Sequence, residues 1–478
     1  MESLNFIDFK TKGLYFRFAL ILNAVFFGIS TFFIVTKCAI PAIRLNLYTV
    51  TLLSAILSSY WVFYLESKGD LFAFINILIF WYFIMFFIPL LLITHYPETR
   101  TKVGYWSFES FELAVFLVIV SFYSLLIGYL FANRVGREWH LHLGEHPSVK
   151  RIILVIIISI ILYIISLILR SYFMGTSILK VLSFHSYATN FTKREYSMGV
   201  YTFTNLLGSG MGYLLLFYLI LPKNTGTKKL LIWFTPIVFL FLIYGLIGAF
   251  LNTSKALFFN LIFLITGYYN YVARKIKPKQ IIAVFFCCVL ILSYFNYRRM
   301  SGDMRGESNI FSITKIMYAQ TFDDMETFAV VCDFFPKKHA YYNGRRTAEE
   351  ILLLPIPRAL WKDKPLAYGF RDILNDINPG WFSYGYHPGL QSQFYADFGI
   401  IGIIVGFFIF GAIIRLIYNS FCKYKCNKGA VIFYITIISN SWLYLKGGFP
   451  WLNLLVISYL PLYLLLMYIY PKINTRRH

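Results

Sequence analysis

Residues 152–173 read IILVIIISIILYIISLILRSYF, and this run decides the fold class. A helix rises about 1.5 Å per residue, so a run of this length crosses a hydrocarbon core of about 30 Å. Similar runs recur along the chain, which is 58% hydrophobic and only 14% charged, whereas soluble domains carry about 25% charged residues. The sequence predicts an all-α polytopic membrane protein. A transmembrane barrel would need short alternating segments, which do not occur.

We expect about 12 transmembrane helices, with a range of 11–13 because the eighth, ninth and eleventh runs are short. The chain then divides into a membrane domain at 1–297, a long extracytoplasmic loop with short helices at 298–393, and a last membrane domain at 394–478. The predicted spans are Leu14–Thr36, Ile43–Leu65, Leu71–Thr94, Phe111–Ala132, Ile152–Phe173, Val200–Leu221, Leu230–Leu251, Ala256–Ala273, Ile281–Tyr297, Phe394–Ser420, Ala430–Leu445 and Phe449–Tyr470.

The distribution of lysine and arginine predicts the orientation. With both termini in the cytoplasm, the cytoplasmic segments carry 20 Lys and Arg residues and the short outside loops carry 9, as the positive-inside rule requires. The long loop between the ninth and tenth spans then lies outside. The net charge of +22 is explained by this topology, and no basic patch outside the spans predicts a nucleic-acid partner.

Ionisable residues are nearly absent from the middle of every span. Arg17, Arg170, Arg415 and Asp397 lie toward span ends, where long side chains can reach the interface. Ion-coupled transporters bury ionisable groups near the midplane, so this pattern disfavours transport. Cys422 and Cys426 lack a second ligand pair for zinc. We therefore expect neither a metal nor a cofactor.

The long loop has three recognisable parts. Apolar spacing predicts a helix over Asn309–Phe335 that Pro336 ends, and Thr347–Glu350 fits a capping box opening a short helix through Leu354. The strip Pro355–Pro365 follows, where prolines fix an extended backbone. Its Arg358, Trp361 and Lys364 suit an anion or a sugar face, or alternatively a surface segment whose cations meet lipid headgroups.

The loop closes with Tyr386-His387-Pro388, which precedes the tenth span. Pro388 can occupy the first helical turn, so His387 would lie just before a positive helix end that depresses imidazole protonation. A neutral imidazole can accept a proton, and the same helix end can bind phosphate. Asp397 is either a second base or a residue that stabilises the helix end. Trp361 and Tyr386 either stack on sugars or anchor the interface. Arg194, in the outside loop near 174–199, can converge on the same face.

These segments resemble the O-antigen polymerase family (Wzy-type oligosaccharide repeat-unit polymerases), which is related to the O-antigen ligases. The resemblance lies in the plan of many spans with a late, long outside loop, in Pro355-x-Pro-Arg-x-x-Trp-x-x-Lys-Pro365, and in His387-Pro-Gly-Leu-Gln followed by Asp397-Phe-Gly-Ile-Ile-Gly402. The last is similar to the family's His-Asn-x-x-Leu and its acidic-x-Gly-x-x-Gly helix start. Here Pro388 replaces the family's Asn.

The resemblance implies a GT-C-like glycosyltransferase of the bacterial inner membrane that polymerises undecaprenyl-diphosphate-linked repeat units without a metal. It implies that His387 is the catalytic base and that Arg298 or Arg299 stabilises the diphosphate. Lys255, in Ser254-Lys-Ala256, stands where the family has Arg. The expected partners are lipid-linked oligosaccharides as donor and acceptor, membrane lipids and a chain-length regulator. The expected substrate-binding residues are Lys255, Arg358, Lys364, Arg194, Trp361 and Tyr386.

Two other functions are open at this point. A ligase would transfer finished glycan to a lipid A core. A polysaccharide flippase, a different class, would have a cation-lined central cavity and lack the long outside loop.

Overall fold

The computed structural model describes residues 25, 28, 41–96, 106–135, 141–174, 177, 219–220, 235–236, 255–277, 279–280, 323–348, 389–447 and 449–471. Within these ranges the chain is helical and contains no strand. Five of the described helices are long and apolar enough to cross a membrane, namely Ile43–Glu66, Phe74–His95, Phe108–Asn133, Val149–Leu169 and Gly389–Tyr424. The predicted class is thus confirmed, while the count of 12 spans and the GT-C-like fold stay predictions.

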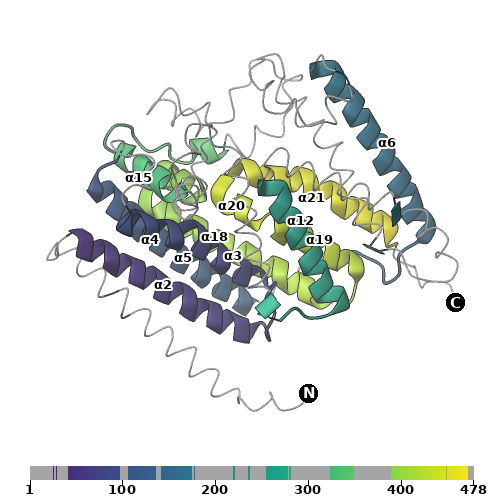
Figure 1. Cartoon of the computed structure of the whole chain (residues 1–478), viewed down its shortest axis with the longest axis horizontal. Coiled ribbons are helices and arrows are strands. Elements are labelled where there is room, and N and C mark those ends of the chain that lie inside the picture. Colours follow the sequence, from purple (N-terminus) through teal and green to yellow (C-terminus); the bar gives the residue numbers. More distant parts are fainter. Residues whose placement is uncertain are drawn as a thin grey trace, which may run out of the picture.

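The observed helices coincide with eight of the predicted spans. Leu14–Thr36, Val200–Leu221, Leu230–Leu251 and Ile281–Tyr297 lie outside the described residues except at isolated positions. The elements, shown in Figure 1, are α2 (Pro41–Glu66), α3 (Phe74–Tyr82), η1 (Phe83–Phe87), α4 (Ile88–His95), α5 (Phe108–Val135), α6 (Val149–Met174), α12 (Lys255–Tyr268), η3 (Tyr269–Ala273), α15 (Asp324–Phe334), α18 (Gly389–Tyr424), α19 (Lys428–Ser439), α20 (Ser441–Gly447) and α21 (Phe449–Ile469).

Two spans are less regular than their apolar sequences suggest. In the third span, Pro89 lacks an amide N–H, and the helix widens to a π-turn, η1, immediately before it. The span expected as one helix at Ala430–Leu445 is instead two helices, α19 and α20, separated at Asn440. The Asn440 amide donates to the Thr436 carbonyl at 3.0 Å and to the Tyr459 hydroxyl at 2.9 Å. These bonds tie the break to α21.

The α5–α18 pair forms the centre of the bundle (Figure 1). A Cβ atom on Gly128 would overlap the carbonyl oxygen of Phe408, and one on Gly411 would overlap that of Leu125. Small residues let two helix backbones approach closely in a membrane, where packing rather than hydrophobicity drives association. The two glycines therefore fix the closest contact between these spans.

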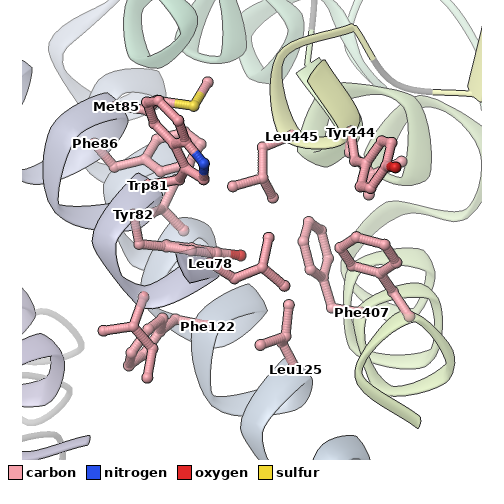
Figure 2. Packing of buried hydrophobic residues seen from close by; sticks show 14 of the residues in the cluster. Leu78, Trp81, Tyr82, Met85, Phe86, Phe122, Leu125, Phe407, Tyr444 and Leu445 are labelled. Atoms are coloured by element: carbon pink, nitrogen blue, oxygen red, sulfur yellow. The ribbon is translucent and has the colours of Figure 1, made fainter. Parts of the chain in front are cut away.

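Aromatic side chains fill the core around this contact. Figure 2 shows Trp81, Tyr82 and Phe122 on one side of the cluster and Phe407, Tyr444 and Leu445 on the other. The indole N–H of Trp81 donates to the Ser441 hydroxyl at 2.9 Å, and the Tyr82 and Ser121 hydroxyls lie 3.0 Å apart. The polar ends of Trp81 and Tyr82 are thus paired inside the bundle.

Polar contacts sort the helix ends into two faces. On one, which we call the loop face, Arg44 of α2 pairs with Glu112 of α5 at 2.8 Å, and α15 packs on α5. On the other, which we call the basic face, Asp70 accepts hydrogen bonds from the hydroxyls of Tyr271 at 2.8 Å and Tyr418 at 3.0 Å. Alternating connections fall on alternating faces, as a sequence of antiparallel spans requires.

The basic face carries the connections expected to be cytoplasmic, and the loop face carries the described part of the long loop. Arg415 was expected to lie toward a span end, where its side chain can reach the interface. It instead donates to Glu66 at 3.0 Å and to Asn133, and its guanidinium lies 4.7 Å from the centre of the Tyr129 ring. Arg415 therefore joins α2, α5 and α18. The assignment of the basic face to the cytoplasm stays a prediction from charge.

Candidate functional site

The predicted site residues fall almost entirely outside the described ranges. Lys255 is the first residue of α12. The others outside the described residues are Arg194, Arg298, Arg299, Arg358, Trp361, Lys364, Tyr386 and His387. Of the predicted long loop and the span after it, the structure describes α15, the segment 335–348 and the start of α18.

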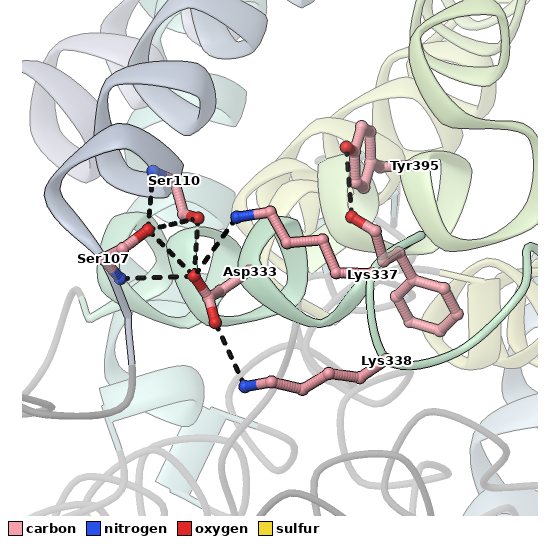
Figure 3. Close-up of polar contacts among 7 residues, drawn as sticks. Ser107, Ser110, Asp333, Lys337, Lys338 and Tyr395 are labelled. Carbon is pink, nitrogen blue, oxygen red and sulfur yellow. Dashed lines mark hydrogen bonds and ion pairs between the residues drawn. The ribbon is translucent and has the colours of Figure 1, made fainter.

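The first attachment of the loop is made by Asp333, near the end of α15 (Figure 3). Its carboxylate accepts hydrogen bonds from the hydroxyls of Ser110 at 2.7 Å and Ser107 at 2.9 Å, both at the start of α5. The ammonium of Lys338 adds an ion pair at 3.2 Å. Burial acts to raise the pKa of Asp333, but these hydrogen bonds outweigh it and bring the pKa to about 2. Asp333 is therefore ionised at neutral pH and holds α15 on the bundle.

The helix expected at Asn309–Phe335 is described only from residue 323 onward, and there α15 ends at Phe334, just before Pro336. It is amphipathic only in part, because both its acidic first turn and its apolar residues are buried. The ring of Phe328 packs on Tyr395 of α18 at 5.9 Å, and the Tyr395 hydroxyl reaches the Phe335 carbonyl at 3.5 Å. α15 thus lies between α5 and α18.

The second attachment is made by Asp397, and it corrects the prediction of a capping box at Thr347. The loop helix begins at Arg345, so Thr347 is inside it and is not its N-cap. Thr347 donates both its backbone N–H, at 3.0 Å, and its hydroxyl to the Asp397 carboxylate. The cap is therefore a carboxylate from a distant part of the chain placed at the positive end of a short helix.

Backbone contacts complete this attachment. The amides of Tyr342 and Asn343 donate to the carbonyls of Ala396 at 3.0 Å and Asp397 at 2.8 Å. Asp397 is only 1% exposed. Asp397 was expected either to stabilise the start of the tenth span or to act as a second base. It instead caps the loop helix that begins at Arg345, and its role as a base stays a prediction.

The Asp397-Phe-Gly-Ile-Ile-Gly402 motif breaks the tenth span. α18 begins at Gly389, earlier than the Phe394 expected, but Gly399 has φ of 63° and ψ of −143° and interrupts it. A side chain at this conformation is strained, which accounts for glycine here. A Cβ on Gly402 would overlap the Phe394 carbonyl, and the ring of Phe394 packs on that of Phe407 at 5.6 Å. The segment before Gly399 therefore folds back against the span after it.

The fold-back brings the start of α18 close to the end of α20. A Cβ on Gly389 would lie 3.3 Å from the carbonyl oxygen of Leu445. The next residue, Lys446, lies 3.6 Å from Asp324 and 4.0 Å from Asp323 at the start of α15. The start of α18, the start of α15 and the end of α20 thus meet near Lys446. In sequence, α21 begins three residues later, at Phe449. His387 precedes Gly389 by two positions.

A scan against protein-family models, a search of the curated proteins and a search of the solved structures found no match.

The sequence reasoning missed Lys446, Asp323 and Asp324 as a group. Lys446 counted only toward the charge of a short outside loop, and the two aspartates were part of a predicted helix. The available signal was an ionisable residue close to the end of an apolar run, which in a membrane protein points to a partner or a function. Among the described residues, no three His, Cys, Asp or Glu side chains are grouped so as to hold a metal ion.

Proposed function

We propose that this protein is a membrane glycosyltransferase that polymerises undecaprenyl-diphosphate-linked oligosaccharide repeat units at the outer side of the bacterial inner membrane. The observation that carries the proposal is the anchored loop face. The described part of the long loop is held on the bundle at Asp333, Asp397 and Lys446. In sequence, the strip that carries Arg358 and the His387 motif lie between the described residues 348 and 389.

The reaction needs two substrates on one face. The hydroxyl oxygen of the acceptor sugar attacks the anomeric carbon of the donor, the bond from that carbon to the diphosphate oxygen breaks, and undecaprenyl diphosphate leaves. His387 takes the hydroxyl proton, an effect worth about 10²–10⁴-fold for a general base. Arg298 or Arg299, with Lys255 and Arg358, stabilises the charge on the departing diphosphate by charge-assisted hydrogen bonds.

The remaining expected residues have supporting roles in this proposal. Lys364 and Arg194 hold the diphosphate or its neighbouring sugar, and Trp361 and Tyr386 stack on sugar faces.

The position of the described charges favours this class over a transporter. Near the basic face, Arg415 pairs with Glu66, and Asp70 accepts a hydrogen bond from a tyrosine hydroxyl. Near the loop face, Arg44 pairs with Glu112, and Lys446 pairs with Asp324. Transporters place such groups at mid-membrane around a cavity. The ligase alternative uses the same donor and the same face, and only the acceptor distinguishes it.

The test is to incubate purified protein with one lipid-linked repeat unit and to separate the products by length on a gel. We expect a ladder with the unaltered protein and its loss in His387→Ala. The matched control is His339→Ala, because His339 is an exposed histidine of the same loop and should leave the ladder intact. A ladder that survives in His387→Ala contradicts the catalytic assignment. No ladder, together with transfer to an added lipid A core, would establish the ligase instead.

A further inference from the structure

One side of α18, around and after the break at Gly399, is exposed and apolar. We call it the α18 stripe, and it consists of Phe398, Ile400, Ile401, Ile404, Val405, Ile409 and Ile413. Because α18 is long and apolar enough to cross a membrane, the stripe faces lipid. From Gly399 to Arg415 a helix rises about 24 Å, which nearly fills a hydrocarbon core of about 30 Å. Arg415 pairs with Glu66 at the basic face, so Gly399 lies close to the lipid headgroups on the loop face.

The loop segment 336–344 meets the α18 stripe at this level. A Cβ on Gly344 would overlap the ring of the exposed Phe398, and one on Gly399 would lie 3.0 Å from the ring of Tyr341. Lys338 precedes Tyr341 by three residues, so the Cα atoms of the two lie within about 10 Å of each other. The headgroup layer is itself about 5–8 Å thick on each side of the hydrocarbon core. The residues just before Tyr341 are therefore within reach of the headgroups.

These residues form an exposed basic turn, Pro336–Ala340, which we call the loop tip. All five are exposed, and the side chains of Lys337 and Lys338 are 59% and 62% exposed. Both ammonium groups share one carboxylate, that of Asp333, at 3.9 Å and 3.2 Å (Figure 3). The same carboxylate also accepts hydrogen bonds from two serine hydroxyls of α5. The two lysines thus exceed their shared carboxylate by one positive charge, and each ammonium has three N–H donors.

Aromatic packing holds the loop tip in shape. The ring of His339 stacks on that of Phe334 with centroids 6.0 Å apart, and it lies 4.9 Å from the ring of Tyr342. The backbone N–H of Lys338 donates to the Phe334 carbonyl at 2.8 Å. Lysines beside aromatic rings are typical of membrane–water interfaces, where the apolar stem and the charged end of the side chain meet different surroundings. The loop tip is therefore an ordered basic surface next to lipid.

We propose that the loop tip binds the phosphate of anionic phospholipid headgroups in the leaflet on the loop face. The ammonium groups of Lys337 and Lys338 donate charge-assisted hydrogen bonds to phosphate oxygens, and basic residues near a membrane surface are attracted to anionic lipids. The α18 stripe contacts the acyl chains below. This contact attaches the long loop to the bilayer, in addition to its attachments to the bundle. It is independent of the reaction proposed above.

The test is photo-crosslinking of the full-length protein in nanodiscs of equal parts phosphatidylglycerol and phosphatidylcholine. The photoreactive residue p-benzoylphenylalanine is placed at Ala340 in the loop tip, and the crosslinked lipids are identified by mass spectrometry. We expect phosphatidylglycerol to be crosslinked at least threefold more than phosphatidylcholine. The matched control places the same residue at Ile401, which is 70% exposed in the α18 stripe. It should crosslink the two lipids equally, because it meets acyl chains.

Variants of the two lysines test whether their charge causes the preference. Lys337→Gln with Lys338→Gln should bring the ratio of the two lipids to about one, whereas Lys337→Arg with Lys338→Arg should keep the threefold preference. Gel filtration checks folding, which the two serines that hold Asp333 should preserve. If the glutamine variant does not fold, about 1 M salt with both lysines present replaces it. Salt at this concentration shortens the screening length to about 3 Å and should abolish the preference.

Four outcomes overturn the inference. They are no lipid crosslinked from Ala340, equal crosslinking of both lipids from Ala340, a preference that persists in the glutamine variant, and a preference that persists in about 1 M salt. A separate arm adds undecaprenyl diphosphate to the same nanodiscs. Crosslinking of Ala340 to this lipid in place of phosphatidylglycerol would show that the loop tip binds the lipid diphosphate, and the inference of a phospholipid contact would then be wrong.

Discussion

Replacing Asp397 by Ala should release the loop segment 341–348 from the bundle. The substitution removes the acceptor of two hydrogen bonds from Thr347. A hydrogen bond to a charged group contributes about 1.5–3 kcal/mol, and Asp397 is almost fully buried, so solvent does not screen the loss. Because the two bonds share one carboxylate oxygen, their contributions overlap, and we take about 3 kcal/mol for the pair.

A loss of about 3 kcal/mol raises the open population of the segment about 100-fold, since 1.4 kcal/mol is a factor of ten. Hydrogen exchange measured by mass spectrometry on the protein in nanodiscs reads this directly. The backbone amides of Tyr342, Asn343 and Thr347 are all donors in the attachment, so a peptide covering them should exchange about 100-fold faster. Thr347→Val removes the hydroxyl bond only and should accelerate exchange about tenfold.

The peptide covering α15 is the internal control, because Asp333 holds it independently. Unchanged exchange of segment 341–348 in Asp397→Ala would refute this account of the attachment. Equal acceleration of both peptides would show a global loss of stability, and the local interpretation would then be wrong.

Three further outcomes are expected. Gly411→Leu should push α18 away from α5 and lower the free energy of unfolding in detergent by about 1–3 kcal/mol or more. Gly28→Leu should change it little, because a Cβ there meets no atom of the described residues within 4 Å. Asp333 has a pKa of about 2 in the folded protein, against an ordinary value of 3.8. Its contribution to the docking of α15 should therefore be complete above pH 4 and lost as the pH falls toward 2. Hydrogen exchange of the α15 peptide should follow this change in the unaltered protein and not in Asp333→Asn. Arg415→Met removes the ion-pair partner that lies 3.0 Å from Glu66 and should lower the free energy of unfolding by about 1–3 kcal/mol. Adding Glu66→Gln should recover part of this loss. Equal stability of the single and the double variant would contradict the pairing.

Two predictions from the sequence were wrong because a residue far away in sequence makes the deciding contact. Thr347 followed by Glu350 satisfies the sequence rule for a capping box, yet the cap of that helix is Asp397. The side-chain carboxylate of Asp397 lies 50 residues from Thr347 in sequence, and no local pattern can reveal it. The apolar run at Ala430–Leu445 was likewise long enough for one span, but Asn440 bonds to Tyr459 and divides it.

Other features were predicted because they depend on composition alone. An apolar run such as Ile152–Phe173 must be helical in a bilayer, since every backbone polar group has to be satisfied within the segment. Helix α6 at Val149–Met174 matches it closely. The alternation of connections between two faces follows in the same way, from the number and length of the runs between them.

The sequence by itself thus determined that this is an all-α membrane protein, where most described spans begin and end, and which connections share a face. These properties follow from the length of apolar runs and from charge. The tertiary structure alone decided that the chain breaks at Gly399, that Asp397 caps a loop helix and that Lys446 meets Asp324 at the start of α15. Each of these depends on the close approach of segments far apart in sequence, which is set by packing between helices and not by any one of them.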